Sequence, residues 1–130
     1  MSVIKFKQIS SLEKVMPDAF PGSEEYSYAS ILRGEEFSYQ IAYWSYEKMF
    51  VRVSVESDLD VKLYDVEFIP SELPAYLNKC DEHYISTNPG MYPDLLIPFK
   101  NNEIVARPVC RSFSVIVYIN SHSYPYIEIL

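Results

Sequence analysis

The sequence predicts an all-β protein, an antiparallel β-sandwich of immunoglobulin-like or jelly-roll-like type with about seven or eight strands. Apolar and polar residues alternate with a period of two in short segments that recur about every 8–12 residues. Twelve tyrosines and seven phenylalanines stand against only three glycines, and aromatic residues favour strands. The 3.6-residue spacing of apolar residues that is typical of helices is almost absent.

The N-terminal part predicts one strand followed by a polar connection. Residues 3–9 alternate between apolar and polar side chains, as a half-buried strand does. Residues 10–15 are ambiguous, because a serine followed by a glutamate resembles a helix cap. Pro17, however, would stop any helix within a turn. Residues 17–25 are predicted to be a polar connection.

The middle of the chain contains the clearest strand patterns. Residues 28–32 predict a short strand that breaks at residues 33–35. The next strand has one face made of Phe37, Tyr39, Ile41 and Tyr43, and another made of Ser38, Gln40, Ala42 and Trp44. In residues 51–55 valines alternate with polar residues. Residues 61–68 predict a strand whose phase slips near Asp65, where we expect a β-bulge.

The C-terminal half mixes strands with a long irregular region. Residues 70–74 contain two prolines and are predicted to end the preceding strand, and residues 75–103 are expected to be mostly irregular. Residues 104–109 predict an edge strand, because one of them is a proline without a backbone donor. Residues 112–119 predict a core strand, and residues 126–130 begin a last one.

The least ordinary stretch is residues 88–99. Three prolines and a glycine in these twelve residues exclude a regular helix and remove ladder donors. The stretch is nevertheless apolar, since it contains Met91, Tyr92, Leu95, Leu96, Ile97 and Phe99. We therefore expect an apolar loop that packs against its own domain or against a neighbour.

Composition restricts the partners and the compartment. At 130 residues the chain is expected to form a single domain, residues 1–130. A net charge of −7 and a pI near 4.7 argue against a nucleic-acid partner and against docking on anionic membranes. The N-terminus lacks the apolar core of a signal peptide, so a cytoplasmic location is expected. Cys80 and Cys110 are then expected to be reduced.

No catalytic motif is present, and no cofactor or metal site is predicted. The segment Asp81–His83 contains metal-ligating residue types, but three adjacent residues on an extended strand cannot all face one ion. Several carboxylate pairs occur, among them Asp58 with Asp60, but they lie at turns where acidic residues cap and solvate the chain. No catalytic residue is assigned.

Surface aromatic residues leave a binding function open. Trp44 and Tyr46, together with several other tyrosines, provide the rings that a carbohydrate-binding module would use as a stacking platform. Aromatic residues on a sandwich more commonly serve core or interdomain packing. Carbohydrate binding through Trp44 and Tyr46 is therefore the alternative prediction.

Five segments together resemble the N-terminal β-sandwich domain of glycoside hydrolase family 123 and its relatives. They are residues 11–15 (SLEKV), 32–43 (LRGEEFSYQIAY), 66–74 (VEFIPSELP), 88–96 (NPGMYPDLL) and 111–115 (RSFSV). The resemblance covers roughly residues 8–120, and the pattern P-G-x-Y-P-D-x-L in residues 89–96 is its most specific part.

The resemblance implies a non-catalytic accessory domain in a β-N-acetylgalactosaminidase-like protein. Catalysis in that family is expected in a C-terminal (β/α)8 barrel, which this chain does not include, so no catalytic residue carries over. The expected partner is that catalytic domain. The interdomain contact is expected to use Met91, Tyr92, Asp94, Leu95 and Leu96 of the apolar stretch.

Overall fold

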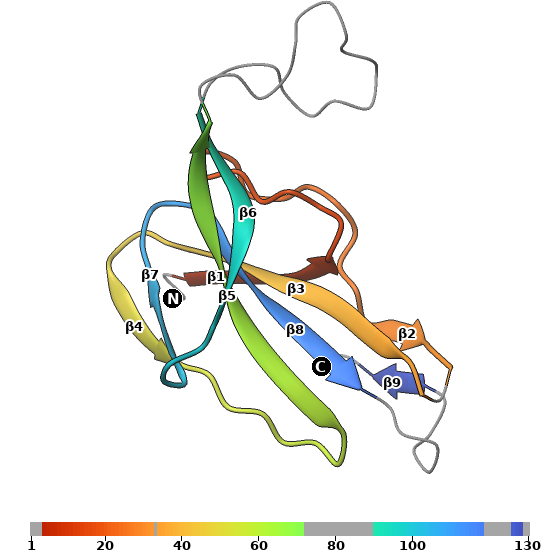
Figure 1. Cartoon of the computed structure of the whole chain (residues 1–130). Coiled ribbons are helices and arrows are strands. Elements are labelled where there is room, and N and C mark those ends of the chain that lie inside the picture. Colours follow the sequence, from red (N-terminus) through yellow and green to blue (C-terminus); the bar gives the residue numbers. More distant parts are fainter. Residues whose placement is uncertain (1–3, 33, 72–89, 119–125, 129–130) are drawn as a thin grey trace, which may run out of the picture.

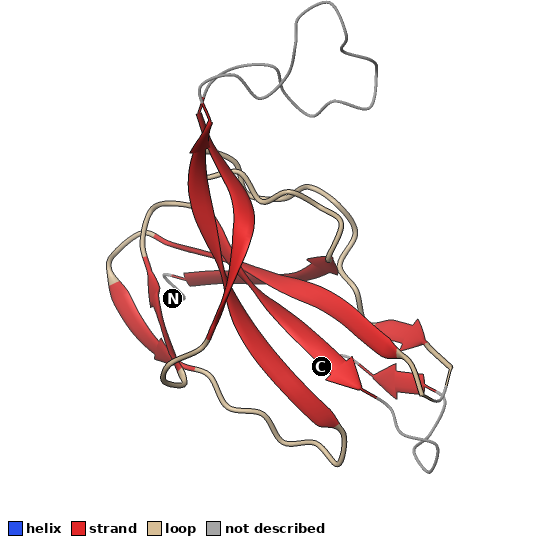
Figure 2. Ribbon diagram, in the orientation of Figure 1, coloured by secondary structure: helices blue, strands red, loops and turns tan. Residues whose placement is uncertain are grey.

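The computed structural model describes residues 4–32, 34–71, 90–118 and 126–128, and within them it confirms an all-β, sandwich-like protein (Figures 1 and 2). The nine described strands are β1 (Ile4–Ser10), β2 (Tyr28–Ser30), β3 (Glu36–Ser45), β4 (Met49–Arg52), β5 (Asp60–Ser71), β6 (Gly90–Pro98), β7 (Glu103–Ala106), β8 (Arg111–Tyr118) and β9 (Tyr126–Glu128). Five of them form one antiparallel sheet in the order β1-β3-β8-β5-β6. The pairs β4-β7 and β2-β9 form two small sheets.

One face of the five-stranded sheet carries the main core. The register pairs Tyr39 with Val115 and Ile41 with Phe113, which places these four side chains on the same face. The β4-β7 pair, whose strands are far apart in the sequence, covers this face and contributes Ile104 and Ala106 to the same buried cluster. Alternation of apolar residues along β3 and β8 therefore predicted the core correctly.

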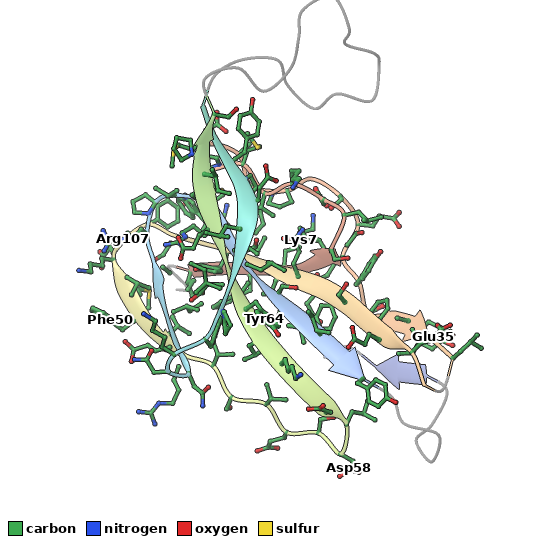
Figure 3. All side chains as sticks on the ribbon, in the orientation of Figure 1. Lys7, Glu35, Phe50, Asp58, Tyr64 and Arg107 are labelled. Atoms are coloured by element: carbon green, nitrogen blue, oxygen red, sulfur yellow. The ribbon has the colours of Figure 1, made fainter. Side chains whose placement is uncertain are left out.

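The β4-β7 pair itself has an inner and an outer side. Met49 and Val51 pack against the core cluster, whereas Phe50 between them is exposed on the outer side (Figure 3). The predicted strand at residues 51–55 is therefore wrong in its bounds, because β4 ends at Arg52. Just beyond that point the Val53 N–H donates to the Asn102 carbonyl at 2.8 Å.

The opposite face is covered near β1 by the segment of residues 11–25. Val15 is buried there with Ile9, Ala42 and Cys110. The Cys110 N–H donates to the Pro17 carbonyl at 3.0 Å, and this bond ties the segment to the start of β8. The segment begins with a turn and not with a helix, as expected from the proline that follows.

The apolar stretch predicted as a loop is largely a strand, and that expectation was wrong. Residues 90–98 pair with β5 at the edge of the sheet, where prolines are tolerated because an outward-facing N–H has no ladder partner to lose. β5 likewise continues through Pro70 to Ser71. Within the described part of residues 75–103, β6 thus takes the place of the expected irregular region.

A β-bulge occurs between β5 and β6, but it lies beyond Asp65, and its extra residue belongs to β6 and not to the strand for which it was predicted. The register shifts between Glu67 and Phe68, whose partners on β6 are Leu95 and Pro93. Asp94 is consequently the extra residue of the bulge. The predictions for Cys80 and for Asp81–His83 fall outside the described residues.

Candidate functional site

A cleft of about 340 Å³ lies on the sheet face opposite the β4-β7 pair. Its floor comes from the middle strands, and its two walls come from the segment after β1 and from β6. The lining residues are Ser11, Glu13, Lys14, Ser38, Gln40, Val66, Pro93, Asp94, Leu96, Ser114 and Ile116. Each of the five segments that carry the family resemblance contributes at least one of these residues.

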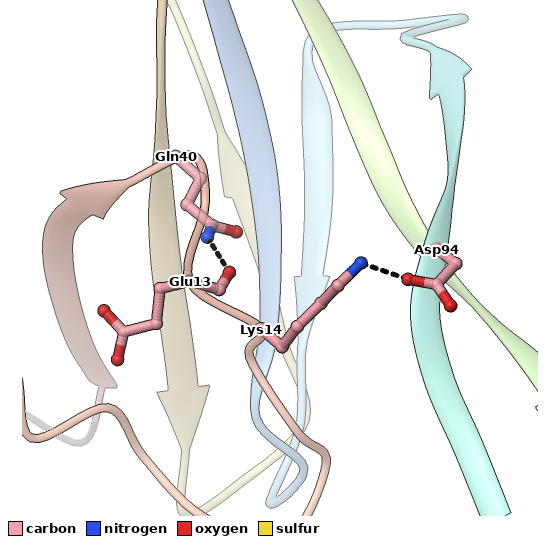
Figure 4. A network of polar contacts seen from close by, with 4 residues as sticks. All are labelled: Glu13, Lys14, Gln40 and Asp94. Atoms are coloured by element: carbon pink, nitrogen blue, oxygen red, sulfur yellow. Dashed lines mark hydrogen bonds and ion pairs between the residues drawn. The ribbon is translucent and has the colours of Figure 1, made fainter. Parts of the chain in front are cut away.

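Gln40 fixes the first wall onto the floor. Its buried side-chain amide donates to the carbonyl of Ser10 at 2.8 Å and also to the carbonyl of Glu13 (Figure 4). These two bonds hold the turn that follows β1 against β3. The Gln40 side chain therefore supplies hydrogen-bond donors to two backbone carbonyls, one at the end of β1 and one in the turn that follows it.

Lys14 and Asp94 join the two walls across the cleft. Their side chains form an ion pair between the segment after β1 and the bulge of β6 (Figure 4). Both side chains are more than a third exposed, so the pair contributes only about 0–1 kcal/mol to stability. Its main effect is to position the bulge relative to the first wall.

The two segments joined by this ion pair also carry exposed apolar side chains. Leu12 is 89% exposed, Met91 44% and Leu96 50%. The register places Met91 and Leu96 on the cleft side of β6, because Pro93 between them pairs with Phe68 and lines the cleft. Together with Lys14 and Asp94, these three residues form what we call the cleft rim.

The predicted interdomain residues are thus divided between two faces. Met91, Asp94 and Leu96 lie on the cleft side, whereas alternation along the strand directs Tyr92 and Leu95 to the other side. Sequence reasoning did not identify Lys14 and Gln40 as members of the site. The polar Gln40 between Ile41 and Tyr39, in a strand with apolar neighbours, was the available signal.

The two predicted sugar-stacking residues lie together at the other end of β3. The Trp44 and Tyr46 rings are 4.4 Å apart between centroids and are inclined at 76°. Because the rings stand edge to face, they do not form one flat platform. Tyr46 is 63% exposed, whereas Trp44 is only partly exposed and packs beside the Ile9 cluster.

A cluster of charged side chains, which includes Arg111, Glu67 and Asp65, lies on the core side of the sheet and does not line the cleft. The Arg111 Nη2 atom lies 2.7 Å from the Glu67 Oε2 atom. Burial raises the pKa of the nearby Asp65, and the charge of Glu67 raises it further while Arg111 lowers it. Burial is also the main cause that raises the pKa of Tyr43 to about 12.

The described residues contain no group of three or more His, Cys, Asp and Glu side chains that could hold a metal ion. Among the same residues no helix has the length and apolar character needed to cross a membrane. Comparison with protein-family models gave no match, and comparison with curated protein sequences gave none. The resemblance to the family 123 domain stays a prediction.

Proposed function

We propose that this chain is a non-catalytic accessory β-sandwich domain that docks through its cleft rim on a glycoside-hydrolase-like catalytic domain, one related to β-N-acetylgalactosaminidases. The observation that carries the proposal is that exposed Leu12, Met91 and Leu96 belong to the same two segments that the Lys14–Asp94 ion pair joins. Exposed apolar residues together with charged ones are typical of protein contact surfaces, which combine an apolar core with a polar rim.

The edge of β6 supports docking by side chains over docking by strand addition. Pro93 and Pro98 lack backbone donors, and the bulge at Asp94 interrupts the edge. Such an edge is a poor template for another strand. A partner is therefore expected to bind through contacts with the apolar side chains of the rim. The surface of a folded catalytic domain can provide such contacts.

The first test is sequencing of the coding DNA downstream of Leu130. An open reading frame that continues with an alternating strand and helix pattern supports the proposal. A stop codon directly after Leu130 contradicts it as stated.

The second test uses the protein that contains both domains. The double variant Met91→Ser/Leu96→Ser removes apolar area from the rim and should raise hydrogen exchange in residues 11–14, because the partner no longer covers them. Phe50→Ser is the matched control, since Phe50 is also exposed but lies on the outer side of the β4-β7 pair, away from the rim. Equal exchange in the double variant, the control and the unmodified protein would contradict docking at this rim.

A further inference from the structure

A second hollow, of about 280 Å³, lies beside Trp44 and is separate from the cleft. It is lined by Lys5, Pro17, Asp18, Phe20, Trp44, Pro108 and Cys110. These residues come from β1, from the segment after it, from β3 and from the approach to β8. None of them lines the cleft, so the hollow is an independent site.

Two aromatic rings and one ammonium group define the shape of this hollow. The Lys5 Nζ atom lies 5.3 Å from the centroid of the Trp44 ring and 6.0 Å from that of the Phe20 ring. Lys5 pairs directly with Trp44 across the strands, which places both on the same face. The Lys5 side chain is exposed and can exchange its place over the indole with a ligand at little cost.

The hollow also presents a hydrogen-bond donor and an acceptor of opposite charge. Lys5 can donate three hydrogen bonds, and the Asp18 carboxylate can only accept them. Both charges act on the Cys110 thiol at the base of the hollow, where Asp18 raises its pKa and Lys5 lowers it, although burial is the larger cause. The ammonium group of Lys5 and the carboxylate of Asp18 therefore both lie at this hollow, and together they give it no net charge.

We propose that the Trp44 hollow binds one pyranose ring of a neutral glycan. The C–H face of the sugar lies on the indole of Trp44, the Lys5 ammonium donates to sugar hydroxyls, and the Asp18 carboxylate accepts from them. Aromatic rings with few polar groups are the usual composition of small-ligand sites. Asp18 and the net charge of −7 disfavour a phosphate-bearing ligand.

The chain reports on this site through its own fluorescence, because Trp44 is its only tryptophan. Titration of the isolated chain with cellotetraose, and separately with a β-1,4-linked galactotetraose, should shift the emission in a saturable way for at least one of them. Adenosine serves as an uncharged aromatic probe. A saturable shift with adenosine and none with either glycan would overturn the proposal, as would no shift with any probe.

Variants of the two polar residues separate binding from unspecific quenching. Asp18→Asn and Lys5→Met should each weaken glycan binding by about tenfold, which corresponds to the loss of one charged hydrogen bond. Asp58→Asn and Lys62→Met make the same changes of charge at exposed positions that do not line the hollow and should leave the affinity unchanged. Equal affinity of all four variants would overturn the assignment.

Trp44→Phe tests the stacking contact with a ring that retains the packing. Saturation-transfer NMR, which needs no tryptophan, should then show glycan binding weakened by several-fold but not abolished. Unaltered binding in this variant would place the sugar elsewhere. These measurements use the chain without a catalytic domain, so failed docking at the cleft rim and failed glycan binding are seen separately.

Discussion

The two faces of β3 and β8 are built from alternating residues of the same strands, yet they are stabilised in different ways. On one face Tyr43, Phe113 and Val115 are buried under the β4-β7 pair. On the other face an apolar cluster around Ile9 and Val15 is buried near β1, but the buried side chains that line the cleft include Gln40 and Ser114. The first face is stabilised by apolar burial, whereas the cleft part of the second face depends on a few directional bonds.

This difference separates the residues that determine the fold from those that position a site. Loss of apolar volume on the covered face should destabilise the whole domain. Loss of a polar contact on the cleft face should release the segment that follows β1 and should lower the free energy of unfolding by a smaller amount. Three substitutions test this division.

The largest effect is expected for Phe113→Ala. Phe113 is buried and contacts the rings of Tyr43 and Phe99, with centroid distances of 6.1 and 5.6 Å. A buried phenylalanine replaced by alanine lowers the free energy of unfolding by about 3–5 kcal/mol. Urea denaturation followed by circular dichroism measures this change. A loss below about 1 kcal/mol would show that the covered face is not the main core.

A pH-dependent effect of intermediate size is expected for Tyr43. Unfolded tyrosine loses its proton near 10.0, whereas burial keeps folded Tyr43 protonated up to about pH 12. Between these values the unfolded state binds fewer protons, so the free energy of unfolding falls as the pH rises, by about 1.4 kcal/mol per pH unit. Tyr43→Phe should reduce this fall. Parallel curves for the two proteins from pH 9 to 12 would contradict the prediction.

The smallest effect is expected for Gln40→Ala on the cleft face. The substitution removes the donor of the Glu13 carbonyl and leaves the Ser10 carbonyl with the Glu13 N–H at 3.2 Å, and the loss costs about 1–3 kcal/mol. Hydrogen exchange should increase in residues 10–15 while the amides shared by β5 and β8 keep their protection. Ser38→Ala removes only an exposed hydroxyl contact from β3 to Ser11 of the same segment, at 3.2 Å, and as the control it should change hydrogen exchange there much less. Loss of protection throughout the sheet would contradict the division between the two faces.

Much of the fold could be predicted from the sequence, because alternation directly reports a half-buried strand. The bounds of β1 and β3 and the core of β8 follow from this pattern. β6 could not be predicted in the same way, because its prolines count against a strand unless the strand is known to lie at an edge. Edge position is a property of the sheet order, which no local pattern reveals.

The candidate site was predicted only in part. Asp94 was expected to contact a neighbouring domain, and the structure shows that it pairs with Lys14, which is 80 residues away in sequence. No spacing rule connects two such residues. The hollow beside Trp44 likewise depends on Lys5 lying opposite Trp44 in the register, and register is set by the whole sheet.

The bulge at Asp94 allows Pro93 and Leu96, three positions apart in the sequence, to lie on the same side of β6. If Asp94 took a regular place in the ladder opposite Phe68, the side chains of Met91 and Pro93 would turn to the other face. The rim would then lose Met91 although every one of its residues was still present. A substitution at Asp94 that keeps the bulge removes only one exposed ion pair and leaves the faces of β6 as they are.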